Sequence, residues 1–160
     1  MNKSLTKKMF EKEAGHLTNL LNRFQSSGGN PSGWEACLDT EVPYLIIYNF
    51  TLPEKFEPKD QEDIVISLAN YPDSPPNGIY IQKTSTRNLS LIKESLKGHI
   101  YDKKYNTEDE IKTLEKNWDW ICFHMKDNKW KYNFEEPLKG DCLYGYLLLL
   151  FSALDGKYTQ

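Results

Sequence analysis

The stretch Tyr71-Pro72-Asp73-Ser74-Pro75-Pro76 decides how this chain of 160 residues folds. Each proline fixes φ and removes a backbone N–H donor, so the stretch can continue neither a helix nor a strand. It follows the apolar run 64–68, which is typical of a buried strand. We therefore expect a rigid, extended elbow at the end of that strand.

An antiparallel meander is expected around the elbow. Residues 44–52 are rich in β-branched and aromatic side chains and predict a strand, as do residues 63–68. Extended structure resumes at 78–81, and a further strand is expected to begin within 32–39. Because turn-length segments link these strands, the pattern favours an antiparallel meander of about four strands.

Helices are expected near both ends of the chain. From Ser4 to Gln25 apolar residues recur at helical spacing, and a run of Ser, Gly, Asn and Pro then ends the pattern. Asp141 is placed to cap an apolar helix over residues 143–154, which Gly156 ends. The predicted fold class is α+β, in one domain over residues 1–160.

Between the strands and the last helix lies a polar insert, residues 84–117, rich in lysine and glutamate. Leu89, Ile92 and Leu96 predict one short helix within it. A second helix is expected to begin at a Thr107 cap followed by acidic residues and to run through Leu114.

Composition and charge exclude several classes of function. The net charge is −3 and the pI is about 5.7, which argues against nucleic-acid binding, since that needs a basic surface. The longest apolar run, residues 147–151, is far too short to cross a bilayer. The first twenty residues are too charged for an export signal, and the three cysteines are an odd count. Free thiols and a cytoplasmic location are therefore expected.

The segment 118–130, expected to be irregular or a short strand, carries Cys122 and His124. Side chains two residues apart on an extended backbone point the same way, so the thiol and the imidazole could share one groove. A thiolate is the reactive form of cysteine, and a nearby cation or hydrogen-bond donor would favour it. The alternative is that Cys122 is a small buried apolar residue, the commonest situation of a lone thiol.

No metal or cofactor is expected. A metal site could draw on Cys122, His124, Cys142 and Cys37, but structural zinc usually uses paired ligands at short spacing, and only one close pair is present. The chain also lacks a glycine-rich phosphate loop followed by Lys-Ser or Lys-Thr, so it binds no nucleotide of its own in this interpretation.

Two further assignments stay open. Trp118, Trp120 and Trp130 either form a binding surface for a partner's extended tail or pack in the core, because tryptophan buries a large area wherever it lies. Asp141 either caps the last helix or orients an incoming amine.

The order and spacing of these motifs resemble the ubiquitin-conjugating (UBC-like) superfamily. Members have a Tyr-Pro-x-x-Pro-Pro elbow after the third strand, and then an Ile-Cys pair with a tryptophan eight residues past the catalytic cysteine. The matching residues here are Tyr71, Pro72, Pro75 and Pro76, followed by Ile121, Cys122 and Trp130.

The chain looks closest to the prokaryotic UBC-like family E, which occurs in bacterial ubiquitin-like conjugation operons that resemble antiphage defence systems. Its members run from an apolar strand through a Leu-Pro turn to a second strand and the elbow. A Trp-rich segment ending in Ser-Arg-His, a Trp and an Asp then precede the last helix. The same order here reads 44–50, Leu52-Pro53, 64–68, Tyr71-Pro72, Pro75-Pro76, Trp118, Trp120, Cys122-Phe123-His124, Trp130 and Asp141.

The resemblance implies a conjugating enzyme that carries a bacterial ubiquitin-like modifier as a thioester on Cys122 and transfers it to an amine of a target protein. His124 would polarise the intermediate or deprotonate the amine. The implied partners are the modifier, an ATP-dependent activating enzyme and the target protein.

One departure from the family matters. The common eukaryotic members have His-Pro-Asn about ten residues before the cysteine, and its asparagine stabilises the oxyanion; Lys112 stands at that distance here. The donor would instead come from Asn117, Asn128, His124 or backbone amides. The missing motif favours an alternative, a non-catalytic UBC-like module that binds a ubiquitin-like protein or partner subunit. A third possibility is an unrelated α+β domain with a coincident elbow.

Overall fold

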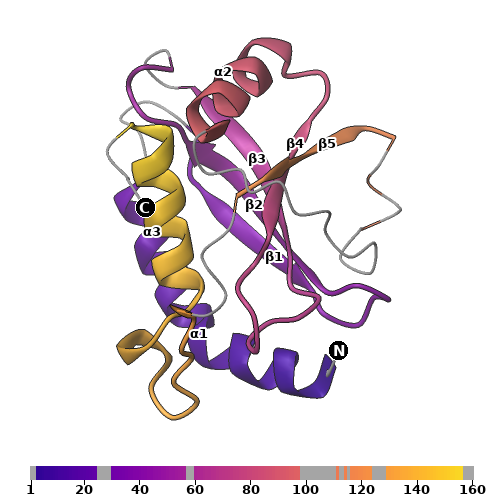
Figure 1. Cartoon of the computed structure of the whole chain (residues 1–160), viewed down its shortest axis with the longest axis vertical. Helices are drawn as coiled ribbons and strands as arrows, with labels where there is room; N and C mark the ends of the chain where they lie inside the picture. Colours follow the sequence, from indigo (N-terminus) through magenta and orange to yellow (C-terminus); the bar gives the residue numbers. More distant parts are fainter. Residues whose placement is uncertain are drawn as a thin grey trace.

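The computed structural model of the chain describes residues 3–24, 30–56, 60–97, 111, 114, 116–123 and 129–156. These residues form an α+β fold, with three α-helices and a five-stranded antiparallel sheet (Figure 1). The elements in chain order are α1 (Lys3–Arg23), β1 (Gly33–Cys37), β2 (Tyr44–Thr51), β3 (Gln61–Ser67), β4 (Gly78–Gln82), α2 (Thr86–Leu96), β5 (Trp118–Cys122), the 3₁₀ helix η4 (Pro137–Lys139) and α3 (Leu143–Leu154).

The sheet is a meander with strand order β1-β2-β3-β4-β5. The antiparallel meander and the helices near both ends are confirmed. The sheet has one more strand than the four expected, because the segment beginning at Trp118 is a regular strand. Its register pairs Ile121 with Ile79 and Cys122 with Gly78. Strand β5 forms one edge of the sheet.

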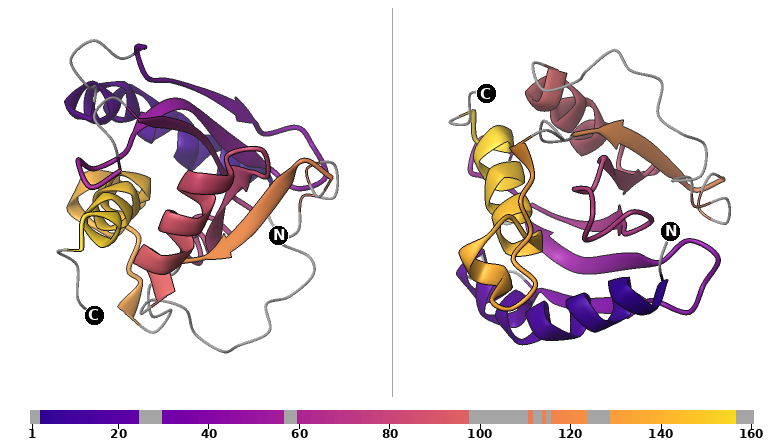
Figure 2. Two further views of the ribbon diagram at one scale, coloured as in Figure 1. Left: turned by 90° about the horizontal axis from the view of Figure 1, so that it is seen from above. Right: turned by 60° about the horizontal axis from the view of Figure 1, so that its bottom comes forward.

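All three helices contribute to one core against one face of the sheet. Helix α3 packs against both α1 and α2. Figure 2 shows this arrangement of the three helices from two directions. The side chains of Ile64, Ile66, Ile79 and Ile81 are 0% exposed in this core. Each contributes about 1.5–3 kcal/mol relative to an exposed position, so the core face of β3 and β4 anchors the fold.

The opposite face of the sheet carries a second, smaller cluster. Val65, between two core residues of β3, packs there with Tyr80 and Ile111, and Trp118 lies against them. Strand β3 therefore has apolar residues on both faces, which explains its continuous apolar run. By strand alternation, Trp120 and Cys122 are on this second face, together with Trp118.

The predictions for the insert had two outcomes. Helix α2 confirms the first short helix. The second, from Thr107 to Leu114, lies outside the described residues except for Ile111 and Leu114.

Helix α3 ends as expected but does not begin as expected. Gly156 has a φ of 76°, in the left-handed region that glycine adopts without a Cβ clash. The prediction that Asp141 caps α3 was wrong: the N-cap residue is Cys142, and it makes no side-chain capping bond. Asp141 Oδ2 accepts the Lys131 N–H at 2.6 Å, and the Asp141 N–H donates to the Lys131 carbonyl at 2.8 Å. Asp141 therefore closes the loop 131–141 instead.

Across the described part of the chain, no helix has the length and apolar character needed to cross a membrane.

Candidate functional site

The elbow is fastened from two sides. The Trp130 indole is 9% exposed, and its N–H donates to the Pro72 carbonyl at 2.8 Å. The Trp130 ring meets the Tyr71 ring edge-on, with 6.2 Å between the ring centroids. Trp130 is thus a core residue that holds the elbow, and of the two interpretations of this tryptophan the structure supports core packing.

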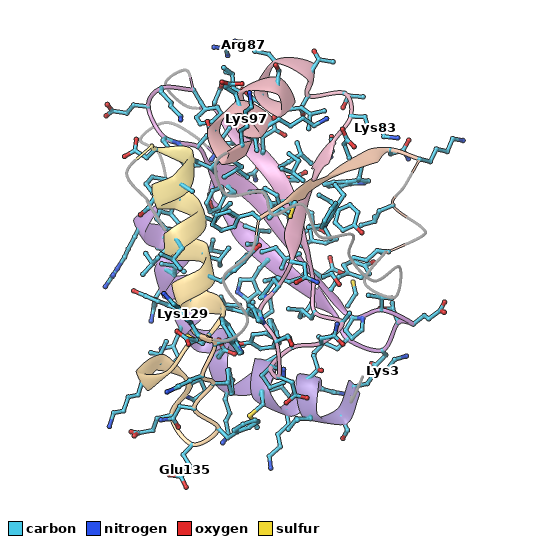
Figure 3. The ribbon with its side chains drawn as sticks, viewed as in Figure 1. Lys3, Lys83, Arg87, Lys97, Lys129 and Glu135 are labelled. Carbon is cyan, nitrogen blue, oxygen red and sulfur yellow. The ribbon has the colours of Figure 1, made fainter. Side chains whose placement is uncertain are left out.

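Glu13 holds the elbow from the other side. This residue of α1 is 1% exposed, and its carboxylate accepts the Tyr71 hydroxyl and, at 2.9 Å, the Tyr132 hydroxyl. Its second oxygen accepts the Leu143 N–H at 2.9 Å. One carboxylate therefore joins α1, the elbow, the loop 131–141 and the start of α3. Glu135 of that loop points outward, into solvent (Figure 3).

Glu13 does for α3 what Asp141 was expected to do. The first N–H groups of a helix have no partner within the helix, and negative charge is favourable at that end. This role of Glu13 was not predicted from the sequence. The available signal was a glutamate on the apolar stripe of the N-terminal helix, one turn from Met9 and from Leu17, where a charged residue is out of pattern.

Burial and hydrogen bonding act in opposite directions on Glu13. Burial disfavours the charged carboxylate, and the bonds from Tyr71, Tyr132 and Leu143 favour it. Burial is the larger effect, so the pKa of Glu13 is raised above its ordinary value. Burial and the Glu13 charge in turn raise the pKa of Tyr71 and of Tyr132, so both hydroxyls stay protonated and donate.

Cys122 is the last residue of β5 and is 7% exposed. Its cross-strand partner is Gly78, which lies two residues past Pro76 of the elbow. The Tyr146 hydroxyl donates to the carbonyl of the next residue, Phe123, at 2.8 Å. Burial, with a contribution from the Cys122 sulfur, raises the pKa of Tyr146. Cys122 is thus a nearly buried residue at the end of β5, opposite Gly78, with little contact with solvent.

The backbone N–H of Cys122 points off the edge of the sheet. The Phe123 N–H donates to the Asn77 carbonyl at 3.0 Å, and the Lys83 N–H donates to the Asn117 carbonyl at 2.8 Å. Because backbone direction alternates along an antiparallel strand, odd-numbered residues of β5 face β4 and Cys122 faces away. No residue in the described ranges accepts its N–H.

The other expected site residues are distributed differently. Asn117 precedes β5 at its far end, and five steps of extended backbone, at about 3.3 Å each, place it about 16 Å from Cys122. It is therefore not a donor for chemistry at Cys122 in this arrangement. His124 and Asn128 lie outside the described residues. Asp141 is engaged by the backbone of Lys131.

A small notch lies between the elbow and β5. Its walls come from Tyr71, Pro75 and Pro76 of the elbow and from Trp120 of β5, which is 38% exposed. Small and polar residues beside them complete the lining: Ser67, Ala69, Asn70, Asn77 and Gly78. A Cβ on Gly78 would lie 2.4 Å from the Ile121 carbonyl oxygen and 2.7 Å from the Trp120 Nε1. Glycine at 78 therefore lets the indole lie across the backbone and shape the notch.

The cysteines are free thiols, and Cys142 is buried beside Glu13. Burial raises the pKa of Cys142. Among the residues that the structure describes, no group of three or more His, Cys, Asp or Glu side chains could hold a metal ion.

Comparisons with protein-family models, with curated proteins and with solved structures found no match to this chain. The class that the fold itself defines is an α+β protein with a helix-covered antiparallel sheet.

Proposed function

We propose that this chain is a UBC-like conjugating enzyme that carries a ubiquitin-like modifier as a thioester on Cys122. One observation carries the proposal: Cys122 is paired with Gly78, directly after the elbow. The bond from Trp130 to Pro72 also supports it, because it joins two of the motifs on which the family resemblance depends. The elbow, Cys122 and Trp130, which the resemblance relates by their order in the sequence, thus also lie near one another in space.

The proposed chemistry is acyl transfer in two steps. The Cys122 thiolate attacks the activated C-terminal carbonyl of the modifier, a carbon–sulfur bond forms, and the activating enzyme's leaving group departs. A target amine then attacks the thioester carbonyl: the carbon–nitrogen bond forms, the carbon–sulfur bond breaks, and the departing Cys122 thiolate takes up the proton that the amine loses. The negative oxygen formed in each step needs a donor, and the outward backbone N–H of Cys122 is suited to that role. The loss of one such donor typically costs about 10²–10³ in rate.

A second candidate is a non-catalytic UBC-like module that binds a ubiquitin-like protein or a partner subunit. The 7% exposure of Cys122 favours it, because an incoming carbonyl must reach the sulfur. In this candidate, Cys122 packs as a small apolar residue and the elbow serves as scaffold.

The deciding experiment mixes the chain with the modifier, its activating enzyme and ATP, and follows adducts by intact-mass spectrometry. We expect a reductant-sensitive adduct that is lost in Cys122→Ala and kept in Cys142→Ala and Cys37→Ala. Cys122→Ser is the matched control, because a hydroxyl would give an ester that survives reductant. Binding of the modifier to the wild type without any adduct would establish the module instead.

A further inference from the structure

The residue after Cys122 is held from two sides. The Phe123 N–H donates to the Asn77 carbonyl at 3.0 Å, and the Phe123 carbonyl accepts the Tyr146 hydroxyl at 2.8 Å. The Phe123 side chain is 0% exposed, and its ring lies against the Tyr146 ring with 5.5 Å between the centroids. Phe123 is thus tied through its N–H to the segment that follows the elbow, and through its carbonyl and ring to α3.

Cys122 therefore lies between two fixed stretches of backbone. On one side, Ile121 is in a hydrogen-bonded pair with Ile79, so the peptide unit that joins the Ile121 carbonyl to the Cys122 N–H has a set direction. On the other side, the bond from Phe123 to Asn77 sets the direction of the peptide unit that carries the Cys122 carbonyl. The thiol and the outward N–H of Cys122 are thereby held together in one arrangement.

The end of β5 needs this support. Strand β5 is at the edge of the sheet, and Cys122 is its last residue. The ends of elements open first, with free energies close to zero, unless further contacts secure them. The Tyr146 hydroxyl supplies such a contact from the helical layer, one residue beyond the end of the strand.

Tyr146 is itself firmly placed. It is the fourth residue of α3 and is 0% exposed, and its N–H donates to the Cys142 carbonyl at 3.0 Å. Three residues earlier, the Leu143 N–H is held by Glu13. Burial, with a smaller contribution from the Cys122 sulfur, raises the pKa of Tyr146, so its hydroxyl stays protonated and donates.

We propose that Tyr146 fixes the end of β5 through the Phe123 carbonyl and is thereby a positioning residue for acyl transfer on Cys122. The inference rests on the proposed function for its chemical consequence and on the contacts above for the positioning. A donor stabilises the negative oxygen of the intermediate only if it already points to where that oxygen forms. Opening of the strand end would move the Cys122 N–H relative to the reacting carbonyl and slow the transfer, although the thiol would still be present.

The test compares two reactions of the Cys122 thiol. The first probe is the 2-mercaptoethanesulfonate thioester of acetyl-Gly-Gly: the thiolate attacks the carbonyl, a negative oxygen forms, the carbon–sulfur bond to the protein remains, and mercaptoethanesulfonate leaves as the thiolate. The second probe is iodoacetamide, from which the thiolate displaces iodide at carbon without forming a negative oxygen. Both rates at Cys122 are followed at one pH by peptide-mass spectrometry, so the exposure and the pKa of the thiol affect them alike.

Tyr146→Phe keeps the ring and removes the hydroxyl. We expect its acylation rate to fall at least about tenfold relative to its alkylation rate, a part of the 10²–10³ that the loss of a whole donor costs. The matched control is Tyr132→Phe, which also loses a hydroxyl bonded to a buried acceptor, in its case Glu13, and should keep the wild-type ratio of the two rates. A contribution of Tyr146 to stability alone would change both rates by the same factor, so an unchanged ratio in Tyr146→Phe would overturn the positioning role.

A second measurement separates the positioning from the acyl transfer. Amide hydrogen exchange of Phe123 is followed by NMR, with Ile79 and Ile81 of β4 as references. In the wild type Phe123 should exchange about as slowly as these two, and in Tyr146→Phe it should exchange at least about tenfold faster while they stay unchanged. Fast exchange of Phe123 in the wild type overturns the positioning role without any variant. If Phe123 behaves as expected but the thioester never acylates the wild type, the proposed enzyme fails and the hold of Tyr146 on the end of β5 stands.

Discussion

Removing the Glu13 carboxylate is the most informative single perturbation of this fold. Glu13→Ala takes away the acceptor of the Tyr71 hydroxyl, of the Tyr132 hydroxyl and of the Leu143 N–H. Tyr71 is 2% exposed and Leu143 is 0% exposed, so neither donor can turn to water, whereas half-buried Tyr132 can. A buried donor left without a partner costs about 1–3 kcal/mol.

The expected loss for Glu13→Ala is therefore about 2–4 kcal/mol of unfolding free energy. The upper end of this range comes from two buried donors, Tyr71 and Leu143, that lose their acceptor. The loss is smaller than their sum because Glu13→Ala also removes the cost of burying a charge. The Leu143 N–H also lies 3.1 Å from the Tyr71 hydroxyl oxygen, which keeps the cost below the full sum. Urea unfolding followed by circular dichroism measures the change, with Glu11→Gln, an exposed carboxylate on the same helix, as the control. A change within about 0.5 kcal/mol of the wild type, the usual range for surface substitutions, would refute the role of Glu13.

Glu13→Gln tests the sign of the electrostatics. Burial raises the pKa of Glu13 in the folded state, so the folded chain holds this proton more tightly than the unfolded chain does. The stability from Glu13 is then fully present below the unfolded carboxyl pKa and is lost as pH rises through the folded pKa. The free energy of unfolding of the wild type should therefore exceed that of Glu13→Gln by the largest amount near pH 4. At higher pH this difference, measured by urea unfolding, should shrink by no more than about 1.4 kcal/mol per pH unit. A difference that grows with pH would mean that the hydrogen bonds outweigh burial.

Three further predictions concern single contacts. Gly78→Ala should lower the free energy of unfolding by about 1–3 kcal/mol in urea unfolding, because the added Cβ meets the Ile121 carbonyl and the Trp120 indole. Gly15→Ala is the comparison: its Cβ lies in open space on α1, so it should raise the free energy of unfolding by up to about 1 kcal/mol. Equal effects of the two substitutions would contradict this. Trp130→Phe removes the bond to the Pro72 carbonyl and should cost about 1–3 kcal/mol, and hydrogen exchange should rise first in the elbow if that bond holds it. Lys93→Ala breaks an exposed ion pair with β5 and should cost less than about 1 kcal/mol, an effect that 1 M salt should abolish; a loss that persists in salt would point to packing instead.

Most elements of the fold could be predicted because their signals are local. The prolines of the elbow remove donors whatever surrounds them, and α1 and α3 follow from apolar spacing and, for α3, from a glycine at its end. The sequence around strand β5 predicted either an irregular segment or a short strand. Its partner β4 is about forty residues away in sequence, and its own pattern of Trp, Asp, Trp, Ile and Cys alternates poorly, so pairing with β4 and not propensity makes it a strand.

The candidate site divides in the same way. The motifs and their order could be predicted from the residues alone: the elbow, the thiol at Cys122, and the tryptophan at 130. Three features depend on the folded chain: Cys122 is nearly buried, Asn117 is at the far end of its strand, and Trp120 forms a notch with the elbow. The same holds for Glu13, which accepts the N–H of Leu143, the first residue of α3, from 130 residues away in sequence. The physical reason is that burial and hydrogen-bond partners depend on which distant segments meet, and neither propensity nor spacing along the chain carries that information.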